Sequence, residues 1–125
     1  MFLHTPAPTA LMPVAAAARA RAEAEAALFR YGCLSRSWGA VELGFGPHSR
    51  RLDVRRLRVN PTLRGHGIGT SLLDAIKAHA TTFGWSVHAL TVTTPAASWW
   101  RLQGFTPDGA SPFCDWFWRP DVCGH

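Results

Sequence analysis

Three glycines alternate at Gly65, Gly67 and Gly69, between a segment that alternates like a strand and a segment with helical periodicity. Glycine lets the backbone adopt a positive φ and lets a ligand approach without a Cβ in its way. Successive amide N–H groups of such a loop point into one concavity, and the helix that follows adds its positive N-terminal end. The sequence therefore predicts a strand–loop–helix unit that binds a phosphate or a diphosphate, although a glycine-rich turn without a ligand would have the same spacing.

The segments beside the loop have clear periods. Residues 38–45 predict a strand, and a turn at 46–49 joins it to an antiparallel partner over residues 51–59. A bulge near the middle of this partner would bring its apolar side chains to one core, namely Leu52, Val54, Leu57 and Val59. After the loop, residues 68–83 predict an amphipathic helix. Its apolar stripe consists of Ile68, Leu72, Leu73, Ile76, Ala80 and Phe83.

The remaining segments complete an alternating order of helices and strands. An alanine-rich helix is expected over residues 15–29, after a proline-rich flexible arm at 1–13. The later elements are expected to be a strand at 86–93, a helix at 96–102, a loop at 105–109 and a strand at 113–118. This order predicts a single α/β (α+β) domain over residues 1–125, with a mixed sheet and helices packed on it.

Three known types of phosphate-binding loop can be compared with the glycine loop. A Walker loop ends in Gly-Lys-Ser/Thr, whereas this chain has Gly-Thr-Ser at the corresponding place. A dinucleotide-binding loop has the spacing Gly-x-Gly-x-x-Gly, which the three glycines do not have. The segment resembles instead the Arg/Gln-x-x-Gly-x-Gly/Ala loop of the GNAT acetyltransferases, which Arg64, Gly67 and Gly69 match in full.

The resemblance to this family covers residues 50–118. It includes residues 90–105, which are similar to the family's second half and end, as that half does, in Gly-Phe. It implies a mixed, mostly antiparallel sheet flanked by helices, with a shortened N-terminal part. The implied cofactor is acetyl-CoA, whose diphosphate the loop amides would hold and whose pantetheine arm would lie along the preceding strand. The cofactor-binding residues that it implies are Leu57, Arg58, Val59, Arg64, Gly65, His66, Gly67, Ile68, Gly69, Thr70 and Trp100.

Acetyl transfer to an amine requires a neutral amine, a polarised carbonyl group and a proton for the leaving thiolate. Members of the family often supply this proton from a tyrosine at the position of Trp100, and an indole has no useful acidity. The candidates for the catalytic base are His88, on the strand beside the expected cleft, and Glu42, on a flanking strand, with Asp53 a weaker choice. Each of them has a structural alternative, as a hydrogen-bonded histidine or a solvent-facing carboxylate.

Two functions are therefore open at the level of the sequence. The first is an acetyltransferase that moves an acetyl group from acetyl-CoA to a primary amine of a small molecule or a peptide. The second is a catalytically weak or inactive GNAT-fold module that binds CoA or a protein partner. Trp100 and the shortened N-terminal part would permit the second function.

Composition narrows the class of partner. Thirteen Lys and Arg residues against eight Asp and Glu residues give a net charge of +5, which suits an anionic ligand such as CoA and does not by itself favour nucleic acid. No apolar run is long enough to span a membrane. The three cysteines have no usual zinc spacing, which favours reduced thiols in the cytoplasm and no metal site. Aromatic residues on both faces of the last strand predict either a compact core or a homodimer that covers one face.

Overall fold

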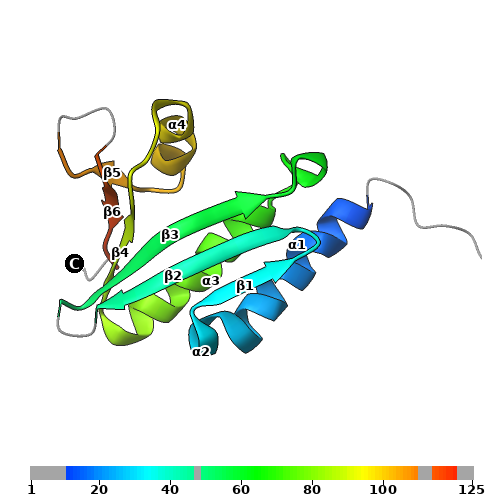
Figure 1. The fold of residues 1–125 in the computed structure, drawn as a ribbon, viewed down its shortest axis with the longest axis horizontal. Helices are drawn as coiled ribbons and strands as arrows, with labels where there is room; N and C mark the ends of the chain where they lie inside the picture. The colour runs from blue at the N-terminus through cyan, green and yellow to red at the C-terminus, as the bar shows by residue number, and fades with distance from the viewer. Residues whose placement is uncertain (1–10, 47–48, 110–113, 121–125) are drawn as a thin grey trace, which may run out of the picture.

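The sheet consists of β1 (Cys33–Arg36), β2 (Gly39–Gly46), β3 (Arg51–Val59), β4 (Ser86–Ala89), β5 (Thr106–Pro107) and β6 (Trp116–Trp118). The computed structural model describes residues 11–46, 49–109 and 114–120, and orders these strands β1-β2-β3-β4-β6-β5 (Figure 1). Within these residues β3 and β4 pair in parallel, and the other neighbouring strands pair antiparallel. The predicted mixed, mostly antiparallel sheet is confirmed.

The helices are α1 (Leu11–Glu23), a π-helical turn η1 (Ala24–Leu28), α2 (Phe29–Tyr31), a 3₁₀ turn η2 (Pro61–Leu63), α3 (Ile68–Phe83) and α4 (Thr94–Leu102). The first three are consecutive along the chain, so the helix predicted at 15–29 is present. It begins earlier, at Leu11, and includes the end of the segment that was expected to be an arm; residues 1–10 lie outside the described part. None of the described helices is long and apolar enough to cross a lipid bilayer.

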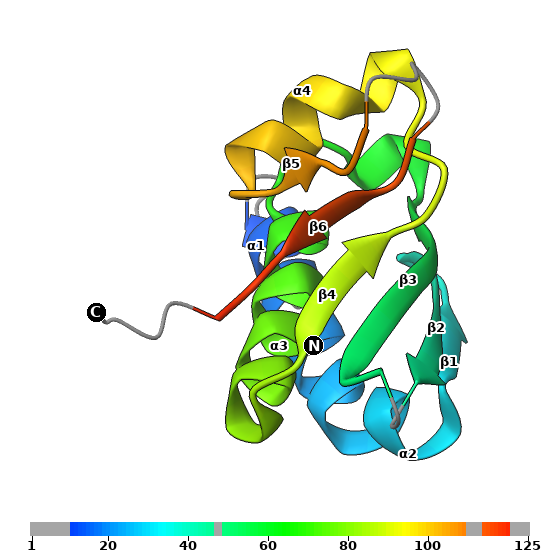
Figure 2. The ribbon, with the colours of Figure 1, turned by 90° about the vertical axis from the view of Figure 1, so that its left-hand side faces the viewer.

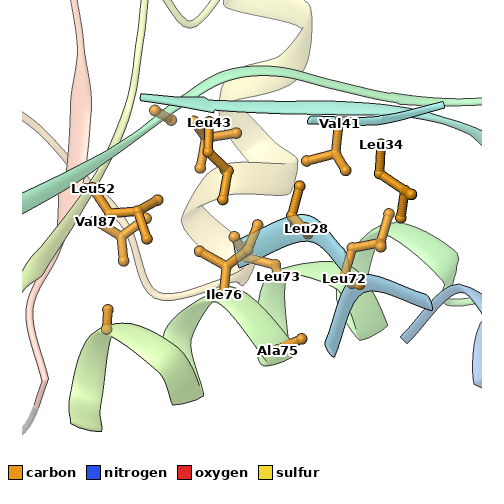
Figure 3. Packing of buried hydrophobic residues seen from close by; sticks show 14 of the residues in the cluster. Leu28, Leu34, Val41, Leu43, Leu52, Leu72, Leu73, Ala75, Ile76 and Val87 are labelled. Atoms are coloured by element: carbon orange, nitrogen blue, oxygen red, sulfur yellow. The ribbon is translucent and has the colours of Figure 1, made fainter. Parts of the chain in front are cut away.

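Helices α1 and α3 lie on the same side of strands β1, β2 and β3, and the opposite side of these strands carries no helix among the described residues (Figures 1 and 2). The core lies between the two layers, where apolar side chains of the sheet meet those of the helices (Figure 3). It includes Leu34, Val41, Leu43, Leu52 and Val87 from the strands and Leu28, Leu72, Leu73 and Ile76 from the helices.

The bulge predicted in the second strand of the hairpin is present. Glu42 of β2 is opposite Arg56 of β3, but the next residue, Leu43, is opposite Val54, so Arg55 is the extra residue. Leu52 and Val54 are buried before the bulge, and Leu57 and Val59 pack against the same core after it. The extra residue therefore keeps the apolar side chains of β3 on one face along its whole length.

The strand predicted at 86–93 is shorter than expected, because β4 ends at Ala89. Thr91 has a φ of 50°, which no regular strand contains, and its N–H donates to Oδ1 of Asp115 at 2.8 Å. The chain therefore leaves the sheet here.

Three other expectations at the ends of elements are corrected. The loop predicted at 105–109 contains the short strand β5, and the final strand begins at Trp116 rather than at residue 113. Residue 113 lies outside the described residues, as do residues 47 and 48 of the predicted hairpin turn. Phe83 does not complete the buried stripe of α3. It is 55% exposed, and its ring packs against those of His79 and Trp85, at centroid distances of 5.1 and 5.4 Å.

Strand β6 lies between β4 and β5, so both of its edges are already paired. Trp116 is buried, and Phe117 and Trp118 are half-buried on opposite faces. A partner chain could meet this strand only through a face of the sheet, and homodimerisation there stays a prediction.

The stripe of α3 can be tested with two substitutions on the same helix. Ile76→Ala should lower the free energy of unfolding by about 2–5 kcal/mol, because Ile76 is fully buried and its loss leaves a cavity. Phe83→Ala, at the exposed end of the stripe, should cost less than about 1 kcal/mol. Urea denaturation measures both values. An equal loss for the two variants would mean that Phe83 belongs to the core after all.

Candidate functional site

Strands β3 and β4 separate after a short parallel ladder. Their residues pair from Arg51 and Ser86 up to Val54 and Ala89, and the N–H of Leu90 makes one further bond, to the carbonyl oxygen of Val54 at 3.2 Å. Beyond that point β3 continues beside β2, whereas the chain after β4 turns away toward α4 (Figure 1). The β4 side of the second half of β3 therefore has no strand partner in the described structure.

A pocket of about 630 Å³ opens at this separation. It is formed by the end of β3, the glycine loop with the first turn of α3, and one face of α4. The lining residues are Leu57, Arg58, Val59, Leu63, Arg64, Gly65, Gly67, Ile68, Gly69, Thr70, Ala96, Trp99, Trp100, Leu102 and Gln103. Below, this space is called the loop pocket.

Asn60 determines where the chain leaves β3 and enters the loop. Its backbone N–H donates to the carbonyl oxygen of Trp38 at 2.7 Å, and its side-chain Nδ2 donates to that of Ser37 at 3.3 Å. Its Oδ1 accepts from the backbone N–H of Thr62 at 3.1 Å and so caps the turn η2. The loop is thus anchored to the turn between β1 and β2.

The glycine loop presents unused amide groups to the pocket. Gly67 has a φ of 87°, a conformation that costs a residue with a Cβ about 1–2 kcal/mol, and it is the N-cap of α3. In the described structure the backbone amides from Gly65 to Thr70 donate to no protein oxygen, while the N–H of Ser71 bonds to the carbonyl of Gly67 at 2.9 Å. Free N–H groups at the positive end of a sixteen-residue helix form a site for an anion.

Gly69 is required for a different reason, because α4 packs directly on it. A Cβ at this position would lie 3.1 Å from Cζ2 of Trp99, which is closer than ordinary van der Waals contact. Trp99 packs edge-on against Trp100, and Trp100 against Phe105, each with centroids 4.9 Å apart. The absence of a side chain at Gly69 thus lets an aromatic cluster form one wall of the pocket.

Polar contacts connect α4 to α3 at the same wall. Nε2 of Gln103 donates to Oγ1 of Thr70 at 3.3 Å, and Nζ of Lys77 donates to the backbone carbonyl oxygen of Gln103. The Lys77 ammonium also lies over the rings of Phe105 and Trp118, at 5.7 and 5.3 Å. Burial lowers the pKa of Lys77, and the nearby Asp74 carboxylate opposes part of this effect.

The residues expected to bind the cofactor come together in this pocket, with one exception. His66 is exposed and does not line it. Sequence reasoning missed the contributions of Leu63 and of most of the α4 face. The signal was present, because Ala96, Trp99, Trp100 and Gln103 have the spacing of a single helix face.

His88 lies on β4, in register with Asp53 of β3 and Phe117 of β6, and does not line the loop pocket. Its Nε2 is 3.2 Å from Oγ of Ser86, and its Nδ1 is buried without a partner in the described structure. Burial lowers the pKa of His88, and the Arg51 guanidinium lowers it further. The third base candidate, Asp53, accepts a hydrogen bond from Nε of Arg51 at 2.6 Å.

Glu42 is exposed on β2, one strand away from the separation of β3 and β4. It lines a second cavity of about 500 Å³, together with Tyr31, the tyrosine of the chain. Strand β3 stands between Glu42 and His88, so the structure does not bring these two candidates together. Tyr31 does not reach the loop pocket and so does not replace the acid that is missing at Trp100.

Comparison with solved structures finds 12 matching chains, and three of them illustrate the similarity. The crystal structure of nourseothricin acetyltransferase has 28% identity and a TM-score of 0.52, over 66% of this chain and 55% of that one. The GNAT family N-acetyltransferase YhbS of Escherichia coli, in complex with CoA, has 18% identity and a TM-score of 0.52, over 94% and 85%. A proposed N-acetyltransferase of Lactobacillus plantarum has 18% identity and a TM-score of 0.58, over 84% and 89%.

This chain therefore spans little more than half the length of nourseothricin acetyltransferase, and the two matches with 18% identity support the fold alone. The search of curated proteins found no match. The model of the acetyltransferase (GNAT) domain matches residues 22–107, which include the hairpin, the glycine loop, α3 and α4. With the separated strands and the free loop amides, this match establishes that the chain belongs to the GNAT acetyltransferase family.

Proposed function

We propose that this protein transfers an acetyl group from acetyl-CoA to a primary amine of a small molecule or a peptide. The observation that carries the proposal is the loop pocket, in which free amides at the N-terminus of α3 adjoin the unpaired edge of β3. Membership of the family supports the transfer of an acetyl group. The choice of an amine as acceptor rests on the resemblance of residues 50–118 to the GNAT N-acetyltransferases.

The residues present fit CoA as a ligand. Its diphosphate needs hydrogen-bond donors and positive charge, which the amides from Gly65 to Thr70 and the side chain of Arg64 would supply. Its pantetheine arm carries amide groups, which the backbone of Leu57 and the N–H of Val59 would pair with at the open edge of β3. The side chain of Arg64 is fixed beside the end of β3, because its Nε donates to the carbonyl oxygen of Val59 at 3.2 Å.

Acetyl-CoA would supply the acetyl group as a thioester. The chain would contribute the polarisation of the carbonyl group, through N–H groups on the free edge of β3. Trp99 and Trp100 would exclude water from that side of the pocket, since both line it and Trp100 is only 8% exposed.

His88 and Glu42 are both proposed as the group that takes the proton of the amine. Both lie on the helix-free side of the sheet, on either side of β3. His88 has a lowered pKa and is therefore neutral at pH 7, which is the form that a base requires. Glu42 is exposed and can act through a water molecule.

One observation favours a second function. The described part of the pocket contains no tyrosine, and Trp100, at the position of the usual acid, is packed against Phe105. A module that binds CoA without turnover would have the same features.

Turnover of acetyl-CoA against a panel of amines tests the first function against the second. We expect mass spectrometry to detect an acetylated amine and free CoA in equal amounts. Binding of CoA, followed as an increase in melting temperature, without turnover of any amine or peptide would favour the module. Absence of both binding and turnover would contradict both functions.

The two glycines of the loop should respond differently from their neighbour His66. Gly67→Val and Gly69→Val should weaken CoA binding by about tenfold to a hundredfold, because a branched side chain strains the loop at the first position and displaces Trp99 at the second. His66→Val should have little effect, since His66 is exposed outside the pocket. Isothermal titration measures the affinities, and circular dichroism checks the fold. Equal affinities in all folded variants would place the diphosphate elsewhere.

The pH dependence can identify His88 as the base. Because burial lowers its pKa, loss of its proton should give an activity that rises with pH below about 6.5, and His88→Gln should remove that rise. Ionisation of the amine itself would give a rise at higher pH, which the variant would keep.

The same pKa has a consequence for stability. The unfolded state binds more protons at His88, so stability present above about pH 6.5 should be lost as the pH falls through the lower folded-state pKa. Thermal melts of the unmodified protein and of His88→Gln between pH 5 and 8 measure this effect.

In the activity test, an unchanged pH profile in the folded His88→Gln variant would exclude His88 as the base.

A further inference from the structure

The second cavity lies at the β1 edge of the sheet and shares no lining residue with the loop pocket. Its volume is about 500 Å³. Its polar lining comes from the end of α2 and from strands β1, β2 and β3. These residues are Tyr31, Cys33, Ser35, Arg36, Glu42 and Arg56. The loop pocket uses none of these groups, and the proposed reaction uses only Glu42.

Two arginines of β3, two residues apart, line different cavities. Because Leu57 and Val59 pack against the core, the alternation of the strand puts Arg56 and Arg58 on the opposite side, where both are exposed. Arg56 lines the second cavity and Arg58 lines the loop pocket. Ala40, which is opposite Arg58 in the register, lines the second cavity as well.

Ala40 contributes a small side chain to the second cavity, whose other apolar lining residues are Ala27, Leu34 and Val41. Across the three strands, Cys33, Glu42 and Arg56 form one row of register partners. Neighbouring strands lie about 4.8 Å apart, so a molecule in this cavity on β2 is about 5–10 Å from the separation beyond β3. A short extended molecule can bridge that distance.

The charges of this cavity are only partly satisfied. Arg36 pairs with Glu23 at 3.4 Å. Arg56 and Glu42 are opposite each other in the register, yet the side chain of neither makes an ion pair or a hydrogen bond within the described residues. A guanidinium group that is free of a carboxylate binds one in a two-pronged geometry. The free carboxylate beside it favours an ammonium group and disfavours a second negative charge.

We propose that the second cavity binds the acceptor, and that the acceptor is a small amino carboxylate. Arg56 binds its carboxylate, the nearby Glu42 disfavours a second carboxylate, and the chain that carries the amine extends over β3 toward the loop pocket. The proposal rests on the proposed function for the reaction itself. In that reaction the amine nitrogen bonds to the acetyl carbon as the carbon–sulfur bond breaks. The amine loses one proton and the sulfur of CoA gains one.

A series of ω-amino acids tests the proposal, since their lengths differ and their end groups do not. Acetylation of glycine, 4-aminobutyrate and 6-aminohexanoate is measured by mass spectrometry, with hexylamine as the probe that lacks the carboxylate. We expect kcat/KM to be highest for one of the two longer amino acids and at least about tenfold lower for hexylamine. A preference for hexylamine, or for glycine, would overturn the proposal and leave the acetyltransferase function intact.

Arg56→Gln and Arg19→Gln form a matched pair, because each removes one exposed arginine and Arg19 lies on α1, away from both cavities. Arg56→Gln should raise KM for 6-aminohexanoate about tenfold or more and leave hexylamine unchanged, while Arg19→Gln changes neither. An effect of Arg56→Gln on CoA affinity instead would assign Arg56 to the donor side and overturn the proposal.

Binding gives a readout that does not depend on turnover. Isothermal titration of the CoA-loaded protein should detect 6-aminohexanoate in the unmodified protein and much weaker binding in Arg56→Gln. Such binding without acetylation would support the acceptor site and count against the proposed function. Equal binding of hexylamine and 6-aminohexanoate would overturn the acceptor site.

Discussion

The rest of the site depends on the end of hydrogen bonding between β3 and β4. One bond after the last register pair, from Leu90 to the carbonyl of Val54, the two chains separate. Thr91 turns with a positive φ, and the Asp115 carboxylate takes its N–H, so the peptide group does not lose a partner when it leaves the sheet.

A ligand site between the separated strands requires that the elements on both sides of it, β3 with α3 and α4, are fixed in place. The core beneath β3 is dense with Leu, Ile and Val side chains from the sheet and from α3, which keeps the strand and the start of the helix in place (Figure 3). On the other wall, α4 is joined to α3 by the contact of Trp99 with Gly69 and by the bonds from Lys77 to Gln103 and from Gln103 to Thr70. Both walls are therefore connected to the same helix, whose N-terminus carries the free amides.

The helix-free side of the sheet has a different character. The face toward α1 and α3 is apolar, whereas the other carries Glu42, Asp53, Arg56 and Arg58 and the half-buried His88. Arg56 and Arg58 are only two residues apart on one strand, and each lines a different cavity. A strand with one apolar and one charged face thus supports the core on one side and joins the two proposed ligand sites on the other.

Local features of the sequence determined much of this protein. The match of Arg64, Gly67 and Gly69 to a phosphate-binding loop, the helix at 68–83 and the bulge in β3 could all be read from neighbouring residues. They depend on backbone geometry and on periods that repeat within one element. The short strand β1 escaped detection, because four residues with a single buried side chain, Leu34, show no clear alternation.

Only the tertiary structure decided how distant segments meet. It brought the face of α4 to the glycine loop, left His66 and Phe83 exposed, and put β3 between Glu42 and His88. It also showed that Arg56 and Arg58, which the sequence presents as one basic run, line separate cavities. The physical reason is that strand order, register and helix packing arise from contacts between segments far apart in the chain, and no local period contains that information.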